Sequence, residues 1–142
     1  MADQFTRQIS QVVRNNAAVR YNYIPVLDGT GASGAAVTTG AGAWGAYADL
    51  AAAGAIATEF WVCGFACYTA AGAQVFQVQL YDATLTVTLA NFLFDPTAVT
   101  VNVVPLLVPF PIYRAAGTQI QARAGGAAAK ALNCHLVYAI GL

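Results

Sequence analysis

The chain shows a regular alternation of apolar and polar residues over much of its C-terminal half. Residues 84–89 show it most clearly, with Leu85, Val87 and Leu89 on one face and threonines on the other. The same period of two recurs in residues 74–81, 118–123 and 132–140. Because successive side chains of a strand point to opposite faces, this period predicts β-strands with one buried face.

Other segments are predicted as strands from their composition. Residues 56–68 form a continuous apolar run, which suits a strand buried on both faces. Residues 21–27 and 99–104 are rich in aromatic or β-branched residues, which favour strands. Together with the alternating segments they raise the count to about eight strands, and almost no segment favours a helix.

Turn signals and prolines separate these segments. Asp82 and Ala83 stand between two alternating segments and predict a two-residue hairpin turn. Pro105, Pro109 and Pro111 restrict their segment to an edge strand or an extended loop. This pattern predicts an all-β fold, a jelly-roll or β-sandwich of about eight antiparallel strands.

The 142 residues fit one domain with one core. Residues 1–20 are polar with scattered apolar positions, and we predict an N-terminal arm there. Residues 21–142 are predicted as a single β-sandwich domain. Residues 29–42 are rich in Gly, Ala, Ser and Thr and predict a long loop within that domain.

The chain is short of charge. Hydrophobic residues make up 58% and charged residues 8%, against about 25% charged in an average soluble protein. The surface must therefore be built from uncharged residues or be covered by neighbours, since buried interfaces are depleted of charge. The formal net charge is zero, which predicts no nucleic-acid partner and no membrane partner.

Targeting and membrane segments are not expected. Residues 1–20 are too polar for a signal peptide. Acidic residues or prolines interrupt every apolar stretch before it reaches about 18 residues, so no membrane span is predicted. Three cysteines without an export signal predict free thiols in a chain made in a reducing compartment.

The few charges are unevenly placed. No basic residue lies between Arg20 and Arg114, where five of the six carboxylates stand. A head-to-tail contact between copies would pair the basic ends with the acidic middle, although chance explains the pattern equally well. The candidate interface residues are Arg7, Arg14, Arg20, Arg114 and Arg123. For the last two we expect an intersubunit or interstrand carboxylate pair, with solubility alone as the alternative.

A glycine-rich motif follows the first predicted strand. Residues 29–34 match the dinucleotide-binding pattern GxGxxG. That chemistry requires the third glycine to open a helix whose N-terminus holds a pyrophosphate. Gly40, Gly42 and Gly45 disfavour such a helix, so we predict a loop and no cofactor.

The cysteines and the single histidine are the other candidates for chemistry. On a strand, Cys63 and Cys67 would share a face but lie about 13 Å apart, too far to hold one metal ion. Cys134 and His135 are neighbours and would point to opposite faces, so they cannot form a nucleophile–base pair. We expect buried free thiols, an outward-facing His135, no metal, no catalytic residue and no enzyme activity.

A family resemblance comes from the C-terminal part of the chain. Residues 109–123 combine a proline–apolar run with the pattern A-G-T-x-I-x-x-R, and a Gly/Ala turn and an apolar final strand follow. Residues 57–64 and 76–80 look like the matching core. Over roughly residues 44–142 the chain resembles small virion structural proteins of tailed bacteriophages.

The resemblance implies a trimeric jelly-roll subunit that decorates or cements a capsid, with a tail or head–tail joining component as related possibilities. Implied partners are further copies of the chain and the major capsid protein or other virion proteins. The resemblance also implies that the protein is made in the host cytoplasm and is located in the virion. It implies neither catalysis nor a cofactor. A second class stays open, a carbohydrate- or receptor-binding β-sandwich module of a tail or fibre. Trp44, Tyr47 or Tyr81 would then line a groove.

Overall fold

The computed structural model describes residues 20–26, 34–68, 74–95 and 106–142. These residues form strands and connections, and none of them lies in a helix that is long and apolar enough to cross a membrane. The prediction of an all-β fold is confirmed. The described strands are β1 (Asn22–Ile24), β2 (Ala35–Ala41), β3 (Ala48–Ala51), β4 (Phe60–Tyr68), β5 (Phe76–Asp82), β6 (Val87–Phe94), β7 (Leu106–Arg114), β8 (Ile120–Gly126) and β9 (Ala131–Ala139).

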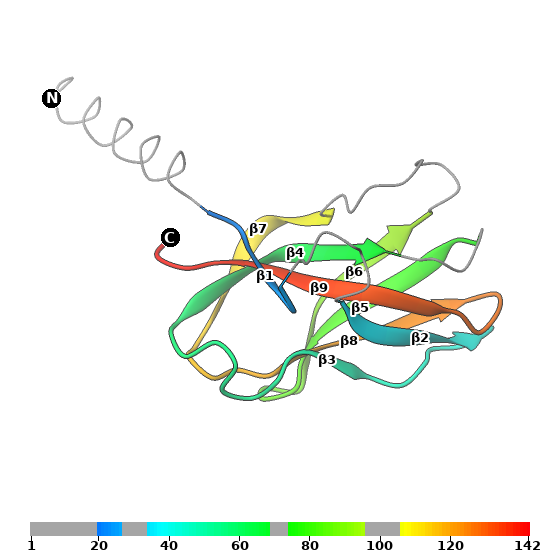
Figure 1. Ribbon diagram of the computed structural model, residues 1–142, viewed down its shortest axis with the longest axis horizontal. Coiled ribbons are helices and arrows are strands. Elements are labelled where there is room, and N and C mark those ends of the chain that lie inside the picture. The colour runs from blue at the N-terminus through cyan, green and yellow to red at the C-terminus, as the bar shows by residue number, and fades with distance from the viewer. Residues whose placement is uncertain (1–19, 27–33, 69–73, 96–105) are drawn as a thin grey trace, which may run out of the picture.

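The strands form two layers joined through β2. Strands β7, β4, β9 and β1 make the first layer, here called the β4 layer, and β6, β5, β8 and β3 make the second, the β5 layer. The first half of β2 pairs antiparallel with β9, and its second half pairs parallel with β8. That parallel pair departs from the predicted antiparallel pattern. The end strands β6 and β7 lie in contact, so the sheet nearly closes on itself (Figure 1).

Large apolar side chains from both layers fill the interior. In β5 the predicted alternation is confirmed, because Phe76, Val78 and Leu80 are fully buried while Gln77 is exposed. Across the interior, the rings of Phe65 in β4 and Phe92 in β6 pack with their centroids 4.6 Å apart. Burial of each such side chain contributes about 1.5–3 kcal/mol, so the alternating strands are held in one register by the core.

A β-bulge interrupts β4. Its register against both β7 and β9 shifts between Val62 and Gly64. As a result Cys67 packs in the main core, whereas Cys63 packs in a small cluster on the outer side of the β4 layer. The prediction that these cysteines share a strand face was wrong, since a bulge adds one residue and reverses the alternation. A methyl group at Gly64 would overlap the carbonyl oxygen of Leu106, so only glycine fits there.

The prediction of a loop at residues 29–42 was wrong for residues 35–41, which form β2. Val37 is fully buried, and the hydroxyl of Thr39 donates to the carbonyl oxygen of Ala128 at 2.7 Å. A Cβ atom at Gly34 would lie 2.7 Å from the backbone of Asn133. The small residues of this segment therefore permit the close approach of β9. The prediction failed because it took the same composition as a sign of a flexible loop. Residues 29–33, which hold most of the GxGxxG motif, lie outside the described residues, as do residues 1–19 of the predicted arm.

The hairpin between β5 and β6 has a longer turn than predicted. Residues 83–86 form the turn, so the strand expected at residues 84–89 begins at Val87. The carboxylate of Asp82 accepts a hydrogen bond from the Leu85 amide at 2.9 Å, which stabilises the turn. Leu85 is consequently exposed instead of buried. The strand predicted at residues 99–104 lies outside the described residues.

Candidate functional site

The outer face of the β5 layer carries two rows of side chains that run across the strands. In β5, Gln77 and Gln79 point outward because the residues between them point into the core. The register of β5 with β6 and β8 places Gln79 between Asn91 and Arg123, and Gln77 between Leu93 and Gly125. Trp44 forms a bridge with Gly125 and extends the second row.

Two aromatic rings hold the guanidinium group of Arg123. Its central carbon lies 4.9 Å from the ring centroid of Trp44 and 4.7 Å from that of Tyr47. Cation–π contacts at these distances are attractive. The Tyr47 ring also packs on that of Tyr81, with centroids 4.6 Å apart. Arg123 therefore acts as a support that fixes Trp44 on the sheet.

Gln79 connects the side chains of its own row through a fixed hydrogen-bond network. Its Oε1 atom accepts from Nε of Arg123 at 2.8 Å and from the hydroxyl of Tyr47 at 3.1 Å. Because arginine only donates, the amide orientation of Gln79 is determined, and its Nε2 atom donates to Oδ1 of Asn91 at 3.0 Å. That contact in turn leaves the amide nitrogen of Asn91 as an outward donor.

Two adjoining hollows lie on either side of Trp44 and together form what we call the Trp44 groove. The first has a volume of about 460 Å³ and is lined by Gly42, Ala43, Trp44, Val75, Gln77, Leu93, Gly125, Gly126 and Ala127. The second has a volume of about 280 Å³ and is lined by Trp44, Gln77, Gln79, Asn91, Phe92 and Leu93. Neither lining includes a charged residue. Of the three aromatic residues expected to line a groove, Trp44 does so, while Tyr47 and Tyr81 lie beside it.

The predicted interface arginines have different surroundings. Arg7 and Arg14 lie outside the described residues, and Arg20 is exposed just before β1. Arg123 contacts aromatic rings and Gln79, so the carboxylate pair expected for it is not found in the described part of the chain. Of the predicted set, the three described arginines, Arg20, Arg114 and Arg123, do not share one site.

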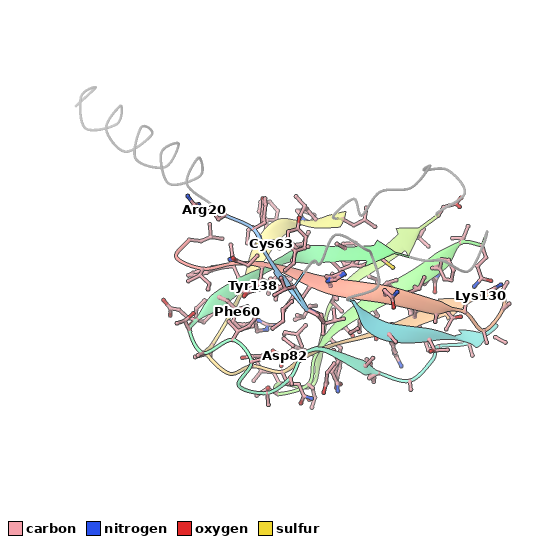
Figure 2. All side chains as sticks on the ribbon, in the orientation of Figure 1. Arg20, Phe60, Cys63, Asp82, Lys130 and Tyr138 are labelled. Carbon is pink, nitrogen blue, oxygen red and sulfur yellow. The ribbon has the colours of Figure 1, made fainter. Side chains whose placement is uncertain are left out.

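Arg114 makes an interstrand carboxylate pair, one of the two kinds of pair expected for it from the sequence. Its Nε atom lies 2.6 Å from Oδ2 of Asp82, which is fully buried, while the Arg114 side chain is 14% exposed. The two atoms do not meet hydrogen-bond geometry, so the contact is electrostatic. A second guanidinium nitrogen, Nη1, donates to the Tyr113 carbonyl oxygen at 2.6 Å. The pair connects β7 of one layer with the end of β5 in the other, where Asp82 is labelled in Figure 2.

The histidine prediction was wrong on exposure. His135 points to the face opposite Cys134, as expected, but it is fully buried. Its Nδ1 atom lies 2.6 Å from the carbonyl oxygen of Pro25, just after β1. Because β1 pairs with β9 beside His135, the outer side of β9 is covered there. No group of three or more His, Cys, Asp or Glu residues suited to a metal occurs in the described ranges.

The cysteines are free and buried, as predicted. Cys67 and Cys134 face each other across β4 and β9, with sulfur atoms 3.5 Å apart. The hydrogen bond between these two thiols, together with burial, raises the pKa of Cys134 well above the ordinary cysteine value. Burial also raises the pKa of Cys63, against a smaller lowering by a hydrogen bond with Ala139.

Cys134 should therefore resist alkylation in the folded protein. At pH 8 we expect iodoacetamide to modify Cys134 at least about 100-fold more slowly in the native state than in urea, because the thiolate is the nucleophile. Since the folded-state pKa is raised, stability should also fall as pH rises above about 8.5. Peptide mass spectrometry after timed labelling measures the rates, and equal rates in both states would contradict the prediction.

Gln79 and Asn91 were given no role from the sequence, although the period of two in residues 74–81 predicted a strand with one outward face. Their alternation with buried residues was the available signal, but the partners Tyr47, Asn91 and Arg123 come from distant segments. Comparison with known proteins gave no match among family models, curated proteins or solved structures.

Proposed function

We propose that the chain is a non-enzymatic structural subunit of a virion, of the capsid decoration or cement class, that stabilises a shell through self-association. The resemblance of residues 109–123 to phage virion proteins points to this class. The observation that carries the proposal is an exposed aromatic anchor on β7. Phe110 is 82% exposed, although it belongs to a strand of the sheet.

The register of β7 explains why Phe110 projects. Val62 and Gly64 of β4 pair with Ile112 and Leu107 of β7, so a single β4 residue faces the four β7 residues 108–111. These four residues, Val-Pro-Phe-Pro, leave the regular ladder. Proline fixes its backbone angle φ and offers no N–H donor, so the two prolines keep this segment out of the regular hydrogen-bond ladder. Phe110 is thus presented outward with little conformational freedom left to lose.

The surroundings of Phe110 suit a protein contact. Leu107 and Tyr113 on the same strand are 47% and 51% exposed. Contiguous exposed apolar groups mark interaction sites, and rigid aromatic anchors supply much of the binding energy at interfaces. In a chain with only 8% charged residues, other copies of the same chain are the proposed first partners. The major capsid protein or another virion protein is the proposed second.

Exchange of Phe110 for aspartate should dissociate the oligomer. We expect wild-type protein to have three times the chain mass in solution. F110D should remain monomeric up to concentrations about 30-fold higher than those at which the wild-type trimer dissociates. That factor corresponds to the loss of about 2 kcal/mol typical of an interface hot spot. Light scattering over a concentration series gives both masses.

Leu85 supplies a matched control, because it is an exposed apolar residue of the β5–β6 turn and not of β7. L85D should keep the wild-type mass. A trimer that survives in F110D would remove the β7 edge from the interface. A wild-type protein that stays monomeric at high concentration and does not bind shells would overturn the proposed function.

A further inference from the structure

The Trp44 groove combines an aromatic ring with amide groups and lacks charge. Its polar side chains are Gln77, Gln79 and Asn91, all primary amides that can both donate and accept hydrogen bonds. In the described part of the chain, the side-chain amide of Gln77 makes no hydrogen bond within the protein. These features define a site with free hydrogen-bonding groups beside an apolar surface, as small-ligand sites have.

We propose that the Trp44 groove binds a neutral oligosaccharide. A sugar ring has an apolar face of C–H groups and a rim of hydroxyl groups. Trp44 is 38% exposed and lies between the two hollows, where its indole can pack on the apolar face. Gln77 and Asn91 are diagonal neighbours on the paired strands β5 and β6, and their amides can bond to hydroxyl groups on the rim.

The lining also discriminates against charged ligands. A phosphate or carboxylate would leave water for a groove without a countercharge, which is unfavourable. Arg123 does not line either hollow, because its guanidinium group is held between Trp44 and Tyr47 and bonded to Gln79. The positive charge of Arg123 therefore lies beside the groove, where it holds the lining side chains Trp44 and Gln79 in place. Neutral, polyhydroxylated ligands therefore fit the lining best.

The site is organised before a ligand arrives. Gln79 is 92% buried by its neighbours, being 8% exposed, and its hydrogen bonds to Arg123 and Asn91 set the direction of the Asn91 amide. Trp44 packs over Gly125, where an added Cβ atom would lie 3.6 Å from the ring, at an ordinary van der Waals distance. Preorganised groups lose little entropy on binding, which favours measurable affinity for a small ligand.

An array of neutral oligosaccharides of three to six units, with sialylated and sulfated glycans in parallel, tests the proposal. We expect the wild-type chain to retain at least one neutral oligosaccharide. Titration calorimetry with that sugar should show at least about 10-fold weaker binding for W44A and for Q77A. Q121A is the matched control, because Gln121 lies on the same face, bonded to Asp49, and lines neither hollow.

Each outcome decides the proposal. Weaker binding in W44A and Q77A with an unchanged Q121A supports it, and Q77A keeps the test valid if W44A does not fold. Retention of acidic glycans alone, of no glycan, or of the sugar by all variants equally would overturn it. A changed oligomeric mass in W44A would instead identify the groove as a contact between copies. None of these results depends on the Phe110 test, so the two proposals fail separately.

Discussion

Replacement of Arg114 by methionine should lower the free energy of unfolding by about 3–5 kcal/mol. Methionine keeps much of the side-chain volume but removes the positive charge. Asp82 is fully buried, and Arg114 supplies its positive partner at 2.6 Å. Without that partner, an uncompensated carboxylate would remain in the interior at the end of β5. Urea denaturation followed by circular dichroism measures the loss.

A second substitution separates the buried charge from side-chain packing. The double variant R114M/D82N removes both charges, and asparagine retains an oxygen for the Leu85 amide. We expect it to be more stable than R114M alone. Arg20 is the control for a charge on the surface, and R20M should change stability by less than about 0.5 kcal/mol. A loss below about 1 kcal/mol in R114M would mean that the pair behaves as a solvent-exposed ion pair.

The sequence predicted the parts of the fold that follow from local periodicity. Alternation placed Phe76, Val78 and Leu80 in the core, and it placed Ile120 and Ala122 there as well. Pro109 and Pro111 predicted an edge strand or an extended loop, and the structure shows the first of these, because β7 ends the strand order. These features depend only on which face of a strand a residue occupies, and the core enforces that choice.

What the sequence missed depends on contacts between distant segments. The bulge at Gly64 moved Cys63 to the outer face, and no period of two could reveal an inserted residue. His135 is buried because Pro25, 110 residues earlier, lies against it. Likewise, the Trp44 groove is assembled from the β2–β3 connection and three strands. Alternation could predict that its strand residues face outward. It could not predict that they lie close together, because that depends on the order of the strands in the sheet.

Gly64 lies at the bulge of β4, where an added methyl group has no room. We expect G64A to lose about 3 kcal/mol of unfolding free energy, at the upper end of the cost of inserting a methyl group into a packed site. The added methyl would overlap the Leu106 carbonyl oxygen and approach the Leu107 backbone to 2.8 Å. Neither neighbour is a flexible side chain, so β4 and β7 must separate. Urea denaturation provides the measurement.

Gly54 provides a control for a positive φ without a steric clash. It has a positive φ of 80° and no atom within 4 Å of an added Cβ. A residue with a side chain in the left-handed conformation costs roughly 1–2 kcal/mol, so G54A should lower the free energy of unfolding by only that amount. The excess loss in G64A then measures the clash with β7. Because the same register shift opens the bulge at residues 108–111, G64A should also weaken self-association through Phe110. Wild-type stability in G64A would show that β7 can move away freely, and the rigid presentation of Phe110 would then be wrong.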